Sequence, residues 1–191
     1  QMATMDEVLN VARNWINVII QQKGYWGGSG TAEVEEIQEF KRLGRVIGYF
    51  CTVKPHGFIV ISLRKELAPV KAYSAITTLN PESEQDLADL IKGGMERILD
   101  AIEGQAGPLQ TASTQAIQRI LEIDYSPSWE ELVRDTESFE QELNAGHLET
   151  NYQGGEVMLT SAWDQNPPYN DDCPLQGCAN ANGRAIVGCV A

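Results

Sequence analysis

The spacing of apolar residues predicts an amphipathic helix near the start of the chain. Apolar side chains recur at helical intervals, at Val8, Leu9, Ala12, Trp15, Ile16, Ile19 and Ile20. Thr4 and Glu7 stand before this run at the spacing of a capping box, and Gly24 follows it. We therefore expect a helix that begins after Thr4, ends before Gly24 and packs its apolar face on the rest of the fold.

Four β-rich runs follow, separated by short turn sequences. They read VEEIQEFKRL, RVIGYFCTVK, GFIVISLRK and APVKAYSAI, and between them lie Gly44, Pro55-His56-Gly57 and a charged Lys65-Glu66 turn. Connections this short favour antiparallel pairing, because parallel neighbours need long crossovers. The stretch GFIVISL is continuously apolar, so we expect it to be the central strand.

Three more helices are predicted in the second half of the chain. The longest covers SEQDLADLIKGGMERILDAIE, with Ser83 as its cap, Gly93-Gly94 as a weak point, and apolar positions at Leu87, Leu90, Ile91, Met95, Ile98, Leu99 and Ile102. Shorter helices are expected over residues 114–121 and 128–143. The pattern as a whole predicts an α+β fold, in which helices pack on an antiparallel β-sheet.

The composition changes after the last predicted helix. The stretch NAGHLETNYQGGEV is rich in Asn, Gly, Gln and Glu and has the character of a protease-sensitive linker. We therefore expect a domain at residues 1–150, a linker at 151–156 and a separate segment at 157–191. The last segment has almost no periodicity, so it is expected to depend on a neighbouring surface.

Charge and composition exclude several classes of function. The net charge is −13, which disfavours binding to nucleic acid or to an anionic membrane surface. No apolar run approaches the roughly 20 residues of a membrane span. The opening residues, QMATMDEVLN, lack the basic and apolar regions of a signal peptide. With 42% hydrophobic residues the chain is nevertheless able to bury a core.

The cysteines and histidines narrow the possible chemistry. Cys173 and Cys178 lie in a polar loop, NDDCPLQGCANANG, either as a disulfide or as two free thiols. Cys51 alternates with apolar neighbours and is expected to be a core thiol. His56 and His147 lie far apart without a C-x-x-C partner, so neither a metal site nor a cofactor is expected.

Cys189, in GRAIVGCVA, has the surroundings of a nucleophile at the first turn of a helix. A helix N-terminus stabilises the reactive thiolate, and Gly188 leaves room for a substrate backbone. Gln165 lies at a workable distance upstream for an oxyanion donor. The residues alone leave a second interpretation open, in which Cys189 is a buried apolar cysteine.

Two stretches carry a resemblance to a known family. The sequence LTSAWDQNPPYNDDCP, followed by GCVA, resembles the start of the mature enzyme in the streptopain family of papain-like cysteine peptidases. Upstream, RVIGYFCTVKPHGFIVISLRKELAPVKAYSAITTLN is similar to the inhibitory propeptide of the same family. The two stretches stand in the expected order and cover roughly residues 34–80 and 157–191. Ala72 departs from this pattern where relatives have glycine.

The resemblance implies a secreted or periplasmic cysteine endopeptidase precursor. Its propeptide would block the active site and assist folding, with Leu79 and Asn80 at the tip that enters the cleft. Cys189 would be the nucleophile and Gln165 an oxyanion contributor. In the family the catalytic histidine follows the nucleophile, so residues 1–191 alone are expected to be inactive. Their partners would be the remainder of the catalytic domain and peptide or protein substrates.

Two other functions remain open. The chain could be a stand-alone inhibitor of a streptopain-like peptidase, in which case residues 1–150 would bind a separate enzyme tightly. It could also be a small-molecule or adhesion module in which GCVA is accidental. Trp15, Trp129 and Trp163 are expected to be core or docking anchors rather than ligand-stacking residues.

Overall fold

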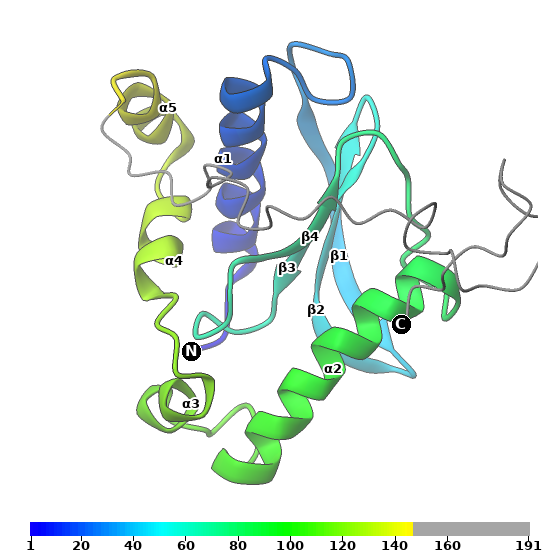
Figure 1. The fold of residues 1–191 in the computed structure, drawn as a ribbon, viewed down its shortest axis with the longest axis vertical. Coiled ribbons are helices and arrows are strands. Elements are labelled where there is room, and N and C mark those ends of the chain that lie inside the picture. Colours follow the sequence, from blue (N-terminus) through cyan, green and yellow to red (C-terminus); the bar gives the residue numbers. More distant parts are fainter. Residues whose placement is uncertain (147–191) are drawn as a thin grey trace, which may run out of the picture. The chain divides into compact units, whose positions relative to one another are not determined.

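A four-stranded antiparallel sheet lies at the centre of residues 1–146, the part of the chain that the computed structural model describes (Figure 1). Within this part, five helices pack against the sheet. The helices are α1 (Met5–Lys23), α2 (Asp86–Ala106), α3 (Thr114–Leu121), α4 (Ser126–Leu132) and α5 (Thr136–Asn144). The strands are β1 (Glu33–Arg42), β2 (Arg45–Lys54), β3 (Phe58–Ser62) and β4 (Val70–Ser74). The predicted α+β class and antiparallel sheet are confirmed.

The strands follow one another in the order β1-β2-β3-β4, and each neighbouring pair is antiparallel. All five residues of β3 are buried, which requires cover on both faces of the sheet. GFIVISL is expected to be the central strand; it forms β3, one of the two inner strands of a four-stranded sheet, and shares that position with β2. The two edges of the sheet are β1 and β4.

The two faces of the sheet carry different helices. Phe50, Phe58 and Val60 join Met95 and Leu99 of α2 in one hydrophobic cluster. Residues that alternate with these three point to the opposite face, where α1 packs on β1 and β3.

Cys51 is one of these alternating residues. It has no exposed surface, and burial raises the pKa of its thiol to about 12. Cys51 is thus a core thiol, as predicted.

Helix α1 begins and ends where its sequence predicts. The Glu7 N–H donates to the Thr4 hydroxyl, while the Thr4 N–H donates to the Glu7 carboxylate, completing the capping box. At the other end, Gly24 adopts a left-handed conformation and donates its N–H to the carbonyl of Ile20.

Helix α2 differs from its prediction at its start and on its buried face. Its N-cap is Gln85, and the Ser83 hydroxyl instead accepts the Gln85 N–H, so the predicted Ser83 cap is wrong. Leu87 and Leu90 are 46% and 68% exposed. The buried face comprises Ala88, Lys92, Met95, Leu99 and Ile102.

Lys92 belongs to this buried face although its side chain is charged. Its side chain is 1% exposed, yet its ammonium lies 3.0 Å from the Glu84 carboxylate and 5.3 Å from the centre of the Phe40 ring. The apolar stem therefore fills core space while the charge is paired at the edge. Gly93, predicted as a weak point, lies inside the continuous helix, where Arg42 occupies the space of a side chain.

The helix predicted over residues 128–143 is in fact two helices, α4 and α5. Asp135 interrupts it by accepting the N–H groups of Glu137 and Ser138, which makes it the N-cap of α5. The Asn14 amide of α1 donates to the carbonyls of Leu132 and Arg134 at the break. Figure 1 shows α4 and α5 beside α1, which both helices contact. The prediction for α3 is confirmed, with Ser113 as its N-cap.

Two of the predicted tryptophan anchors are in the core. Trp15 is 8% exposed, and Trp129 is 2% exposed with its indole N–H 2.7 Å from the carbonyl of Leu67. Trp163 lies outside the described residues. None of the helices described in residues 1–146 is long and apolar enough to span a membrane.

Candidate functional site

The residues proposed for catalysis fall beyond the described part of the chain. Cys189, Gln165, Cys173 and Cys178 all lie outside residues 1–146. The nucleophile, the oxyanion contributor and the disulfide therefore stay predictions. Leu79 and Asn80 are described, and they lie in the segment between β4 and α2. We call this segment, residues 75–85, the exposed connection.

Local polar contacts shape the exposed connection. The Ser74 hydroxyl accepts the backbone N–H groups of Ile76 and Thr77 at 3.3 and 2.9 Å. Farther along, the side-chain oxygen of Asn80 accepts the Glu82 N–H at 3.0 Å. Asx and Ser/Thr turns of this kind give a segment a defined path without a helix or strand.

The exposed connection presents a different apolar side chain from the one predicted. Leu79 is partly buried and packs against the hydrophobic core, whereas Asn80 is exposed. Ile76 is 78% exposed and is followed by the exposed Thr77 and Thr78. Both apolar residues lie in one Thr-rich stretch, so the sequence held no signal to separate them. The tertiary structure buries Leu79 against the core and leaves Ile76 exposed.

Two glycines allow neighbouring loops to approach the start of the exposed connection. A Cβ at Gly27 would lie 2.2 Å from the Ala75 carbonyl oxygen, and one at Gly57 would lie 2.1 Å from the Ser74 oxygen. Both glycines have positive φ angles, 55° and 108°. At the end of β4 the chain therefore passes between the α1–β1 loop and the β2–β3 turn and lies close to both.

Trp26 and His56 join these two loops. Trp26 has no exposed surface, and its indole N–H donates to the His56 carbonyl at 2.8 Å. His56 lies in the turn between β2 and β3, as predicted. The contact joins the α1–β1 loop to the β2–β3 turn.

A hollow lies beside the exposed connection, and we call it the sheet-end hollow. It is lined by the end of α1, the loop after it, β4 and the start of the connection, and it includes Lys23, Tyr25, Tyr73 and Ile76. The ring of Tyr73 is held by Trp15, whose ring centre lies 5.4 Å away. Tyr25 is 53% exposed, so aromatic and aliphatic side chains stand at the rim of the hollow.

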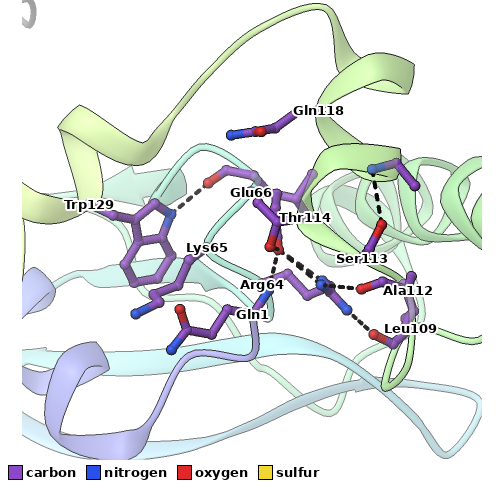
Figure 2. A network of polar contacts seen from close by, with 12 residues as sticks. Gln1, Arg64, Lys65, Glu66, Leu109, Ala112, Ser113, Thr114, Gln118 and Trp129 are labelled. Carbon is purple, nitrogen blue, oxygen red and sulfur yellow. Dashed lines mark hydrogen bonds and ion pairs between the residues drawn. The ribbon is translucent and has the colours of Figure 1, made fainter.

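A buried polar network occupies a separate region, at the β3–β4 turn (Figure 2). Arg64 and Glu66 form two contacts, at 2.9 and 3.0 Å, and both side chains are almost fully buried. Arg64 also donates to the carbonyls of Leu109 and Ala112, while Thr114 donates to Glu66 at 2.7 Å. The predicted Lys65-Glu66 turn is present, but the burial of Glu66 was not foreseen.

The charge state of Glu66 follows from its partners. Burial alone would raise the pKa of its carboxyl group, but hydrogen bonds from Arg64, the Gln1 nitrogen and Thr114 together lower it to about 2. Arg64, Glu66 and Thr114 each form a hydrogen bond with another of these side chains, and Arg64 also donates to backbone carbonyls. The network therefore joins the β3–β4 turn to the start of α3 and has a structural role.

Other chemistry receives no support from the described residues. Across residues 1–146, no group of three or more His, Cys, Asp or Glu side chains is arranged to hold a metal ion. The carboxylates of the helices are mostly paired or exposed, as in the Arg45 contacts with Asp100 and Glu103.

Comparison of the chain with known protein families, curated proteins and solved structures found no match.

Proposed function

We propose that the chain is part of a secreted cysteine endopeptidase precursor of the streptopain type. Residues 1–150 would be the inhibitory propeptide domain, residues 151–156 the linker, and residues 157–191 the start of the catalytic domain. The proposal is supported by the order of the two motif stretches and by the α+β domain that contains the first of them. In this proposal the propeptide blocks the active site and assists folding of the enzyme.

The observation that carries the inhibitory role is the geometry of the exposed connection. Ala75 at its start lies close to Gly27, and Leu79 packs against the core. Both ends of the segment from Ala75 to Leu79 are therefore held in place by the rest of the fold. That segment projects Ile76 into solvent. A segment already held in shape loses little entropy on binding, which favours tight occupation of a cleft. We therefore propose that Ile76, and not Leu79, is the apolar residue of this segment that contacts the cleft.

The proposed chemistry depends on Cys189. Its thiolate would attack the carbonyl carbon of a peptide bond, forming a thioester as the protonated amine leaves, and water would then hydrolyse the thioester. A hydrogen bond from Gln165 would stabilise the oxyanion of each tetrahedral intermediate. The required general base is a histidine, and His56 does not suit this role because it belongs to the β2–β3 turn of the propeptide domain.

The inhibitory role is tested by adding the 191-residue chain, carrying Cys189→Ala, to the mature peptidase from the complete precursor. We expect inhibition of peptide hydrolysis. Ile76→Asp should raise the inhibition constant about tenfold or more, because a buried apolar contact becomes an unpaired charge. Leu43→Asp is the matched control, since Leu43 is 86% exposed in the β1–β2 turn.

The outcomes separate the proposal from its rivals. Equal inhibition by the Ile76→Asp and Leu43→Asp variants would remove the exposed connection from the interface. A stand-alone inhibitor would block a separate streptopain-like peptidase while its own precursor showed no reactive Cys189. An absence of inhibition would favour a binding or adhesion module.

A further inference from the structure

Strand β4 has an edge that no other strand covers within residues 1–146. It pairs with β3 on one side, and the sheet order places it at the margin. All five of its residues are only half-buried, in contrast to β3. In an antiparallel strand, alternate residues direct their N–H and C=O groups away from the paired neighbour. The outer side of β4 therefore offers hydrogen-bonding groups to a further strand.

The opposite edge of the sheet is better protected against such pairing. Strand β1 carries Glu33, Glu35, Glu36 and Glu39, and its pairing with β2 has two irregularities. Charged side chains and bulges discourage the addition of strands at an edge. In β4 the sequence VKAYS has one charged residue, Lys71, and its pairing with β3 has a single irregularity, between the partners Val70 and Ala72.

Two lysines near the β4 edge differ from the other lysines of residues 1–146. Four lysines contact a carboxylate, in the pairs Lys41–Glu39, Lys54–Glu35, Lys65–Glu7 and Lys92–Glu84. Neither Lys23 nor Lys71 has such a contact among the described residues. Lys23 and Lys71 thus carry positive charges without a carboxylate contact in a chain with a net charge of −13.

Both of these lysines lie close to Tyr73. The ammonium of Lys23 is 5.8 Å from the centre of the Tyr73 ring. Lys71 is two positions before Tyr73 in β4, and burial lowers the pKa of its ammonium. A partly buried cation gains from a carboxylate that replaces its lost hydration. The edge thus combines unpaired backbone groups, two cations and the apolar rim of the sheet-end hollow.

We propose that the outer edge of β4 binds an extended acidic segment of a partner protein as a fifth strand. Its carboxylates would pair with Lys23 and Lys71, and its apolar side chains would contact Tyr25 and Ile76. In such strand addition, main-chain hydrogen bonds supply affinity and side-chain contacts supply specificity. The same lysines repel basic segments, so they both protect the edge and select its partner.

This inference stands apart from the proposed peptidase function. It rests on the β4 edge and on the charges of Lys23 and Lys71, which are complementary to an acidic extended segment of a partner protein. The screening length at physiological salt is about 8 Å, so the two lysines beside the edge dominate over more distant carboxylates.

The test uses the full 191-residue chain and a fluorescein-labelled synthetic peptide in which Glu alternates with Val and Phe. Fluorescence anisotropy should show binding that weakens as salt is added. Replacing each Glu of the peptide with Lys should weaken binding about tenfold or more, because attraction becomes repulsion. A proline at the centre of the acidic peptide should do the same, since proline cannot continue a strand.

Variants of the protein locate the binding site. Lys71→Glu and Lys23→Glu should each weaken binding of the acidic peptide about tenfold, whereas Lys41→Glu, which makes the same charge change at the other edge, should not. Lys71→Gln removes the charge with little change in size and should give an intermediate loss, and circular dichroism checks that each variant is folded. Equal binding of the acidic and basic peptides, tolerance of the central proline, or unchanged binding to both folded Lys71 variants would overturn the proposal.

Discussion

At the scale of single residues, the pair Arg64–Glu66 shows how a charged side chain can belong to the core. Two ions removed from water are stable only when their mutual attraction and further hydrogen bonds replace the lost hydration. Arg64 meets this condition through Glu66 and two backbone carbonyls, and Glu66 through Arg64 and Thr114. Removing one member leaves the other buried without its partner.

We expect Glu66→Gln to lower the free energy of unfolding by about 3 kcal/mol at neutral pH, because Arg64 then lacks its counter-ion. The folded-state pKa of Glu66, about 2, lies below the ordinary value of 4.5, so this carboxylate stabilises the fold above pH 4.5. Its contribution is lost as the pH falls from 4.5 toward 2, because the unfolded chain takes up the proton first.

Urea unfolding of both proteins across this pH range provides the measurement. The difference between the wild type and Glu66→Gln should shrink as the pH is lowered. Glu142→Gln is the control, because its partner Arg134 is exposed and the change should cost less than about 1 kcal/mol. A difference that stays constant down to pH 2 would contradict the assigned role of Glu66.

At the scale of elements, the exposed connection depends on loops that are distant in sequence. Gly27 belongs to the α1–β1 loop, yet its missing side chain makes room for the Ala75 carbonyl at the end of β4. The path of the connection is therefore set by a residue outside it.

We expect Gly27→Ala to destabilise the fold by about 2 kcal/mol or more and to weaken inhibition by the exposed connection. The added methyl group would lie 2.2 Å from the Ala75 oxygen, and alanine is strained at a φ of 55°. Gly30→Ala is the matched control from the same loop, since a Cβ there meets nothing within 4 Å. Thermal unfolding and the inhibition constant measure the two effects. Equal behaviour of the two variants would show that the contact at Ala75 does not shape the connection.

At the scale of the whole molecule, the proposal assigns one cysteine to chemistry and another to packing. The Cys51 thiol is fully buried with a raised pKa, so it is protected from electrophiles. Cys189 is proposed to become reactive only with the rest of the catalytic domain. The 191-residue chain alone should therefore hydrolyse no peptide.

In the complete protein with its propeptide removed, we expect a peptidyl electrophile to alkylate Cys189 irreversibly. Mass spectrometry of the digested protein identifies the labelled residue. Cys189→Ala should abolish labelling, and Cys51→Ala should leave it intact. If the mature protein neither hydrolyses peptides nor labels preferentially at Cys189, the peptidase proposal fails.

The sequence by itself determined the local elements of this protein. The capping box at Thr4 and Glu7, the terminal Gly24 and the apolar run of β3 act through neighbouring residues, so helix α1 and the inner strand could be predicted. The short turns likewise determined the antiparallel pairing of successive strands.

Only the tertiary structure decided which side chains are buried and where the second half of the chain breaks. Lys92 is buried while Leu90 is exposed, and Leu79 reaches the core while Ile76 does not. The separation of α4 from α5 involves Asn14, a residue of α1 that is distant in sequence. Burial and hydrogen bonding between distant segments depend on how the elements pack, and the spacing of residues along one segment carries no record of that packing.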